Sequence, residues 1–132
     1  MALKLTLRPH ERMIIGGAVV KNGNKAADLF VENNVSILRA RNILSEGEAN
    51  SPCRQIYFII QLMYIDTGDL QEYRNVYRGL IQEVIKAAPS TLNLIERINE
   101  SVRSSQYYQA LKVARKLIDY EEELLNYVHE SV

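Results

Sequence analysis

Arg54 and Gln55 are the residues of this sequence best placed to bind an anion. They follow Ser51 and Pro52, an N-cap residue and a proline suited to the first helical position, so both fall in the first turn of a predicted helix. The unpaired backbone N–H groups and the positive dipole of a helix start favour a phosphate or a carboxylate there. The alternative is structural: Arg54 pairs with a carboxylate such as Glu48, and Gln55 caps backbone groups of the strand region and locks the sheet to the helices.

Residues with the chemistry for catalysis or metal binding are few and scattered. His10 and His129 stand at opposite ends of the chain, without the Cys or carboxylate spacing of a metal site. Cys53 falls in the same helix start, where the dipole favours a thiolate, but a lone cysteine in apolar company is typical of a small core residue. Gly16 and Gly17 lack the spacing of a phosphate-binding loop and predict a tight turn. We therefore expect no catalytic residues, no metal and no cofactor, and a protein that is not an enzyme.

Basic side chains are concentrated in the first third of the chain. Residues 1–44 hold seven basic and three acidic side chains, a net charge of +4, whereas residues 45–132 hold nine and thirteen, a net charge of −4, so the whole chain is neutral. A basic sub-region on a neutral protein can gather a polyanion locally, and an ordinary solvated surface is the alternative.

The eight tyrosines and an acidic run are further candidates for partner binding. All the tyrosines fall on predicted helices, whereas RNA-binding platforms that stack bases present aromatic side chains on an open sheet. We expect most of them in the core or at the rim of an interface. Glu121–Glu123, followed by Leu124, Leu125 and Val128, predicts either a helix that continues past the core to meet a partner or a solvated end.

Short apolar stretches alternate with turn signals in the first forty residues. Leu3 to Arg8 alternates apolar and polar residues, which places the leucines on one face of a half-buried strand. Further strands are predicted at residues 13–15, 18–20, 27–31 and 35–39, separated by Pro9-His10, Gly16-Gly17, Asn22–Asn24 and Glu32–Asn34. This density predicts a small antiparallel sheet or sandwich, with a hairpin at the two glycines.

The apolar spacing changes to three and four residues after Ser45 and predicts four helices with short connections. Two starts compete for the first helix, a capping-box spacing at Ser45 and Glu48 and the Ser51-Pro52 pair. Gly68 ends this helix, and Asp69 with Glu72 repeats the capping box for the second. The third carries Leu94 to Val102 and the fourth Tyr107 to Val128. We expect an α+β protein with a β-rich sub-region at residues 1–44 and an α-helical sub-region at residues 45–132, in one compact domain.

The composition predicts a soluble, cytoplasmic protein. A chain of 132 residues, 47% of them hydrophobic, is long enough to bury one core. The longest apolar run, Ile56 to Ile65, is interrupted by Gln61 and is too short to span a membrane. The N-terminus has no continuous apolar segment of the kind found in signal peptides, and one cysteine excludes a disulfide within the chain.

One segment has many fixed positions at a specific spacing. Pro52, Arg54-Gln55, Tyr57-Phe58, Gln61, Met63 and Ile65-Asp66, together with Leu3–Pro9, Glu11-Arg12 and Gly17–Val19, resemble in order and spacing the FlbT family of flagellum biosynthesis repressors of alphaproteobacteria. The later helices match more loosely, mainly through Ala110–Lys112. His10 stands where the family often has glycine.

The resemblance implies a cytoplasmic regulator that associates with the 5′ untranslated leader of flagellin mRNA and promotes its degradation or blocks its translation. Some members act positively. It also implies FlaF or flagellin as protein partners, so an adaptor that binds them and affects RNA indirectly is the alternative. No membrane is expected as a partner, and a homo-oligomer is left open.

Our hypothesis for the RNA contacts combines this resemblance with the charge distribution. Basic side chains would contact phosphates and single-stranded bases of the leader, and the helices would recruit another factor. The candidate RNA-binding residues are Arg12, Lys21, Lys25, Arg39 and Arg41 in the strand region, with Arg54 at the helix start.

Overall fold

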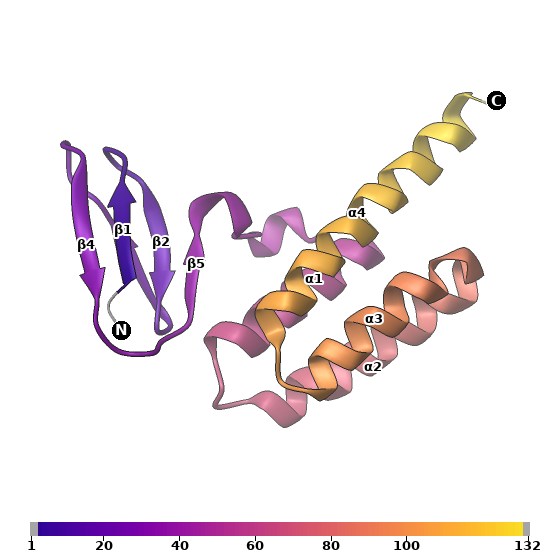
Figure 1. Ribbon diagram of the computed structural model, residues 1–132. Coiled ribbons are helices and arrows are strands. Elements are labelled where there is room, and N and C mark those ends of the chain that lie inside the picture. Colours follow the sequence, from indigo (N-terminus) through magenta and orange to yellow (C-terminus); the bar gives the residue numbers. More distant parts are fainter. Residues whose placement is uncertain (1–2, 131–132) are drawn as a thin grey trace. The chain divides into compact units, whose positions relative to one another are not determined.

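The computed structural model describes residues 3–130, and for residues 129 and 130 the backbone only. Its internal contacts divide the chain into two compact units with the boundary between Ile43 and Leu44, which we call the β unit and the helical unit. Within the described range, five short strands precede four α-helices (Figure 1). The expected fold class, α+β with a small antiparallel sheet before a bundle of helices, is confirmed.

The β unit contains two antiparallel sheets. One pairs β1 with β4, and the other has the order β3-β2-β5. The strands are β1 Leu3–Leu7, β2 Arg12–Ile15, β3 Ala18–Lys21, β4 Ala27–Val31 and β5 Ile37–Arg39, and a 3₁₀ turn, η1 Ala40–Asn42, follows them. The predicted strands are therefore confirmed to within two residues at their ends.

The hairpin between β2 and β3 turns at Gly16 and Gly17. Ile15 pairs with Ala18 across the ladder, so the loop has two residues, and their φ angles are 56° and 88°. A two-residue hairpin loop with positive φ at both positions suits glycine, because glycine has no Cβ to clash there. His10 also has a positive φ, of 62°, in the turn after β1. Glycine would adopt this conformation without strain, whereas histidine has a Cβ that disfavours it.

The alternating pattern of β1 produces the core of the β unit. Leu5 and Leu7 are buried with Met13 from β2, and residues from the other strands pack against them. Successive side chains of a strand alternate between its faces, so Leu5 and Leu7 point inward while Lys4 and Thr6 point outward, and Leu3 at the start of the strand is half exposed. The two faces have opposite character, which fixes the register of the β1–β4 pair.

The helical unit begins with a 3₁₀ turn, η2 Glu46–Glu48, and contains four α-helices. These are α1 Pro52–Ile65, α2 Leu70–Ala87, α3 Leu92–Arg103 and α4 Tyr107–Glu130, with a second 3₁₀ turn, η3 Pro89–Thr91, before α3. α1 packs against α2 and α4, and α3 packs against α4. The last turns of α4 extend beyond the neighbouring helices of this unit (Figure 1).

Both competing start signals near α1 are used, each by its own element. Ser45 and Glu48 form a capping box around η2, in which the Glu48 carboxylate accepts the Ser45 N–H at 3.0 Å. Ser51 then caps α1, accepting the Arg54 N–H at 3.2 Å, with Pro52 at the first helical position. Two adjacent caps therefore belong to two consecutive helical segments.

The capping box predicted at Asp69 and Glu72 is wrong. Asp69 precedes α2, but its backbone lies at φ −117° and ψ 32°, outside the extended region of a capping residue, and its side chain accepts no capping bond. Asp66 instead accepts the Gly68 N–H at 3.1 Å and the Tyr73 hydroxyl at 2.6 Å. The carboxylate that links α1 to α2 therefore lies three residues earlier than the sequence pattern indicated.

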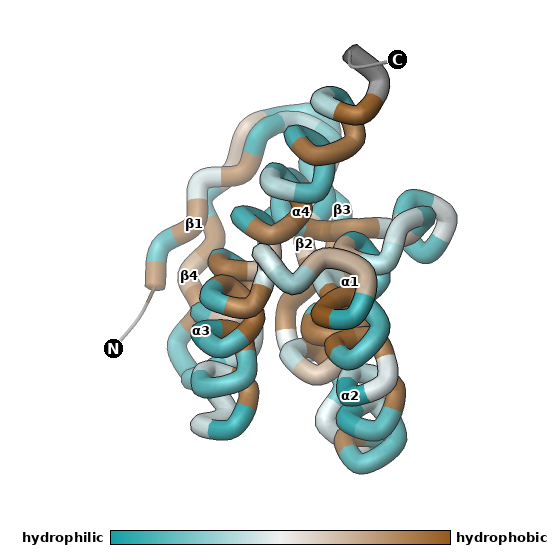
Figure 2. Tube along the Cα trace, turned by 90° about the vertical axis from the view of Figure 1, so that its right-hand side faces the viewer, coloured by the Kyte–Doolittle hydropathy of each residue, from teal (hydrophilic) through white to brown (hydrophobic). Residues whose placement is uncertain are grey.

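α1 is buried on most of its circumference, as expected. Seven of its fourteen residues are buried, and Ile56, Ile60 and Met63 are fully inaccessible. In Figure 2 the trace of α1 is mostly hydrophobic, whereas α2 and α3 carry many hydrophilic residues. A helix enclosed in this way has few positions at which a polar side chain avoids the core.

Gln61 is the polar exception in the buried part of α1. Its side chain is 3% exposed, and it forms two hydrogen bonds with the backbone of Leu44. The Leu44 N–H donates to Oε1 at 2.8 Å, and Nε2 donates to the Leu44 carbonyl at 2.9 Å. The Gln61 amide therefore satisfies both backbone groups of Leu44, as a neighbouring strand would, and attaches the start of the helical unit to α1.

Replacing Gln61 with leucine tests this clamp. We expect Gln61→Leu to lower the free energy of unfolding by about 2–4 kcal/mol, because it leaves one buried N–H and one buried carbonyl unpaired. Gln55→Leu is the matched control: it makes the same change on the same helix, at an exposed side chain, and should cost less than about 0.5 kcal/mol. Urea denaturation followed by far-ultraviolet circular dichroism measures both. Equal effects of the two substitutions would contradict the clamp.

Candidate functional site

The anion-binding position at the start of α1 is occupied by a carboxylate of the protein itself. Glu121 of α4 accepts the Ser51 hydroxyl at 2.5 Å and the Cys53 N–H at 3.2 Å. A carboxylate is stabilised here by the free N–H groups and the dipole of the helix start. The anion predicted from the sequence is therefore present, but it is supplied by the fourth helix.

Arg54 also contacts α4. Its Nη2 atom lies 2.7 Å from Oε1 of Glu122, and its Nη1 donates to Asn50 at 2.9 Å. The structural alternative, pairing with a carboxylate, is thus observed, with Glu122 in place of Glu48. Both ends of the guanidinium fork have partners within the helical unit, so Arg54 is held as a clamp between α1 and α4.

Gln55 does not make the contact expected of a lock between sheet and helices. Its side chain is exposed and forms no hydrogen bond within the described part of the chain. The glutamine of α1 that does clamp a backbone segment is Gln61, and its partner, Leu44, belongs to the helical unit. A buried glutamine in a long apolar stretch is the sequence signal that would have identified it, because a buried amide needs partners.

Cys53 is a core residue. It is 3% exposed, and burial, together with the adjacent Glu121 carboxylate, raises the pKa of its thiol to about 12. The negative charge of Glu121 offsets the positive end of the helix dipole, so the environment of Cys53 favours the neutral thiol over the thiolate. A nucleophilic cysteine at this position is thereby disfavoured.

One end of the β unit gathers most of its positive charge. β1 and β5 end there, β2 begins there, and the ladder pairs Arg12 directly with Lys21 and Met13 with Arg39. The loops at residues 8–11 and 22–26 close the same end and are bonded to each other. We call this surface the basic end and define it by Arg8, Arg12, Lys21, Lys25, Arg39 and Arg41.

Hydrogen bonds fix the loops that carry the basic end. The Asn22 side chain donates to the carbonyls of Arg8 and Lys25, at 2.8 and 2.9 Å, and the His10 N–H donates to the Gly23 carbonyl at 2.8 Å. An open pocket of about 410 Å³ lies beside them. It is lined by Arg8, Pro9, His10, Glu11, Arg39, Ala40 and Arg41.

Arg12 and Lys21 form a like-charged pair across the β2–β3 ladder. Both side chains are exposed, and the register places them directly opposite each other on one face. Like charges in that position are destabilising, so this pair opposes the pairing of its own strands. A polyanion bound over the two side chains would remove the repulsion.

Arg39 has a different role from the other residues of the basic end. Its guanidinium binds Glu11 through Nε at 3.2 Å and Nη2 at 2.9 Å, and Nη2 also donates to the Thr6 carbonyl at 3.0 Å. Glu11 in turn accepts the Arg8 N–H at 2.9 Å. This network connects β5 to the end of β1, so Arg39 positions the basic end more than it offers free donors to a ligand.

Glu11 is held as a carboxylate by these contacts. The pKa of its side chain is lowered, first by the hydrogen bond from the Arg8 N–H and then by the bond and charge of Arg39. A carboxyl group whose pKa is lower in the folded state than in the unfolded state stabilises the fold at pH values above its ordinary pKa. That stabilisation is lost as the pH falls through the folded value.

Two exposed residues of the β unit, Arg8 and Phe30, lie outside the set of site residues predicted from the sequence. Arg8 lines the pocket of the basic end, and its place at the end of an alternating strand was the available signal. Phe30 of β4 is 61% exposed and lies opposite Lys4, on the outer face of the β1–β4 pair. An exposed aromatic side chain on an open sheet face is the arrangement that stacks bases in single-stranded RNA.

The described side chains give no support for metal chemistry. Among them, no three His, Cys, Asp or Glu residues lie close enough together to hold a metal ion; the side chain of His129 is outside the described set. Within residues 3–130, no helix combines the length and the hydropathy required to cross a membrane. The fold and the sites define a small α+β protein with a cationic surface on its β unit and a helical unit in which α4 supplies the anion at the start of α1.

Comparison with known proteins places the chain in a family. The family model for the flagellar protein FlbT matches residues 3–125. A probable flagellum biosynthesis repressor protein FlbT 1 of Bradyrhizobium diazoefficiens is 45% identical, over 94% of this chain and 85% of its own length. The flagellum biosynthesis repressor protein FlbT of Caulobacter vibrioides is 34% identical, over 100% of this chain and 95% of its own. The chain belongs to the FlbT family of flagellar proteins, and no solved structure matches it.

Neutralising Glu121 tests its position at the start of α1. We expect Glu121→Gln to lower the thiol pKa of Cys53 from about 12, because the nearby negative charge disappears while burial remains. The rate of iodoacetamide alkylation as a function of pH, with the fold intact, measures that pKa. Glu123→Gln removes a charge from an exposed neighbour and should leave the profile unchanged. An unaltered profile in Glu121→Gln would contradict the contact.

Acid titration tests the Glu11 network. The protection factors for amide hydrogen exchange in the β unit, which correct for the slower intrinsic exchange in acid, should fall as the pH drops from about 4.5, the ordinary value for glutamate, through the lower pKa of folded Glu11, because the stabilising carboxylate becomes protonated. Glu11→Gln should show lowered protection factors already at neutral pH and little further change in them in acid. Glu32→Gln, at an exposed site in the same unit, serves as the control and should resemble the unmodified protein. Equal protection factors in Glu11→Gln and Glu32→Gln would contradict a stabilising role for the Glu11 carboxylate.

Proposed function

We propose that this protein regulates flagellum biosynthesis from the cytoplasm by binding the 5′ untranslated leader of flagellin mRNA, thereby blocking translation or promoting degradation of the message. Membership of the FlbT family supports the flagellar role, and relatives that align over nearly the whole chain carry the name of flagellum biosynthesis repressors. The observation that carries the RNA proposal is the basic end. It collects six basic side chains from three strands, two loops and the 3₁₀ turn η1 of a unit of about 43 residues.

The basic end suits the phosphate backbone of a single strand. Arg12, Lys21 and Lys25 are exposed and have no carboxylate partner among the described side chains. Arg8 and Arg41 line the adjacent pocket, while Arg39 is fixed by Glu11 and supports them. Each unpaired cation that meets a phosphate releases condensed counterions, so the affinity should depend strongly on salt. Arg54, paired with Glu122 in the helical unit, is not part of this proposed contact.

Phe30 supplies a second type of contact. It lies on an outward-facing sheet surface with Lys4 opposite it, and Lys4 is 3.7 Å from the Asp28 carboxylate. An unstacked base can pack on the exposed ring, whereas a paired base in a duplex cannot. Phosphate contacts at the basic end together with stacking on Phe30 favour a single-stranded region of the leader.

The helical unit provides a surface for a protein partner. The last described turns of α4 expose Leu125, which is 56% accessible, and Val128, which is 58% accessible, beside the acidic Glu122 and Glu123. In the proposed mechanism this end of α4 recruits another factor, with FlaF or flagellin as candidates. The competing function is an adaptor that binds such a partner through α4 and affects the mRNA only indirectly.

Charge reversal at the basic end tests direct RNA binding. We expect Arg12→Glu/Lys21→Glu/Arg41→Glu to weaken binding to the leader at least 100-fold. The slope of log affinity against log salt should fall by about 2, because three single-strand phosphate contacts contribute roughly 0.7 each. Phe30→Ala should weaken binding roughly 5- to 100-fold with an unchanged slope, since stacking is uncharged. Gel shifts at several salt concentrations, with a scrambled leader for comparison, measure these effects.

The control variant carries the same change in charge elsewhere. Lys86→Glu/Arg97→Glu/Lys116→Glu alters three exposed cations of the helical unit and should bind the leader within about threefold of the unmodified protein. Circular dichroism confirms that each variant is folded. If the triple variant of the basic end binds the leader with unchanged affinity and salt slope, direct binding through this surface is wrong and the adaptor function is favoured.

A further inference from the structure

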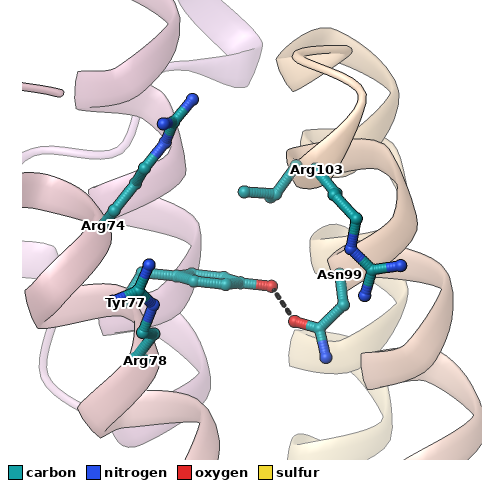
Figure 3. Close-up of a pocket in the computed structure, with 6 residues that line it drawn as sticks. Arg74, Tyr77, Arg78, Asn99 and Arg103 are labelled. Carbon is teal, nitrogen blue, oxygen red and sulfur yellow. Dashed lines mark hydrogen bonds between the residues drawn. The ribbon is translucent and has the colours of Figure 1, made fainter. Parts of the chain in front are cut away.

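A pocket between α2 and α3 in the helical unit is lined by three arginines and by no carboxylate. Arg74 and Arg78 lie one turn apart on α2, and Arg103 is the last residue of α3. Tyr77, Asn99 and Val102 complete the lining, and the volume is about 280 Å³. Figure 3 shows Tyr77 reaching from α2 to Asn99 on the facing helix, with the arginines around them. We call this site the three-arginine pocket.

The positive charge of the three-arginine pocket is not neutralised among the described side chains. Arg39 and Arg54 each form a close ion pair with a glutamate, but no carboxylate oxygen of a described side chain lies within 4 Å of a nitrogen of the three arginines of the pocket. Arg74 donates only to a neutral group, the Tyr107 hydroxyl, at 3.2 Å. Like charges at positions i and i+4 of a helix repel each other, so Arg74 and Arg78 are mildly destabilising as they stand. An anion in the pocket would offset that repulsion.

The floor of the pocket offers hydrogen-bond donors. The Tyr77 hydroxyl donates to Oδ1 of Asn99 at 2.5 Å, and burial raises the pKa of Tyr77, so this donor stays protonated. The acceptor of the Asn99 amide is thus used, and its nitrogen retains two N–H groups. Guanidinium groups carry donors and no acceptors. The pocket is therefore suited to a ligand that only accepts hydrogen bonds.

We infer that the three-arginine pocket binds the phosphate group of a phosphorylated ligand. One arginine can bind a carboxylate with both arms of its guanidinium group. A phosphate has up to two negative charges and three or more acceptor oxygens, so it can bind several guanidinium groups at once. The volume admits a phosphate and a small attached group. The inference does not depend on the RNA proposal, because it concerns the other unit and none of the residues of the basic end. The phosphate can belong to a small phosphorylated molecule or to a nucleic-acid backbone.

Nuclear magnetic resonance titration with inorganic phosphate at constant ionic strength tests the inference. We expect saturable shifts of the amides around Tyr77, Asn99 and Arg103 and of the Asn99 side-chain N–H groups, with a dissociation constant on the order of millimolar. Arg78→Gln/Arg103→Gln should weaken this binding at least tenfold. Lys86→Gln/Arg97→Gln removes two charges from the same two helices outside the pocket and should change it less than twofold. Overlaid circular dichroism spectra show that the variants are folded.

Two further ligands distinguish the sources of the phosphate. Tighter binding of a nucleoside 5′-monophosphate than of a single-stranded RNA hexamer identifies a small phosphorylated molecule, and the reverse identifies a nucleic-acid backbone. Both results support the inference. It is overturned if inorganic phosphate gives no saturable shifts, if the Arg78/Arg103 variant binds as well as the unmodified protein, or if neither larger ligand binds as tightly as inorganic phosphate.

Discussion

The start of α1 depends on an anion, and the helical unit supplies it from its own last helix. α1 is the helix on which α2 and α4 pack, and Cys53 in its first turn is buried, so the Cys53 N–H has little access to water. An unsatisfied helix end in that setting is costly. Glu121 resolves it by accepting from Ser51 and Cys53, while Arg54 reaches back to Glu122. Two consecutive glutamates thereby fix the register of α4 on α1.

Local patterns were sufficient to predict most of the architecture. The alternating leucines of β1, the glycine pair of the hairpin and the Ser51-Pro52 start are short-range signals whose physics is contained within a few residues. The capping box predicted at Asp69 was wrong because residue spacing alone does not determine the backbone angles on which a cap depends. Asp66 is favoured there by a contact with Tyr73, one turn into the next helix.

The candidate sites were harder to predict, because they depend on long-range partners. The sequence places a cation at the helix start but does not show that Glu122, 68 residues later, is its partner. It likewise gives no sign that Glu11 fixes Arg39 while Arg12 and Lys21 meet without a counterion. The net charge of residues 45–132 concealed the arginines that α2 and α3 bring together. Charge counts along a chain therefore locate basic regions, and pairing in space decides which charges are available.

The burial of the single cysteine has a practical consequence. A thiol that is 3% exposed and whose pKa is raised to about 12 reacts slowly with maleimides and with mild oxidants near neutral pH. A second cysteine introduced on an exposed strand, for example in place of Val19, would then take up a fluorophore or spin label selectively, with Cys53 left in the core. The native chain is in this sense ready for site-specific spectroscopy of its β unit without prior removal of a cysteine.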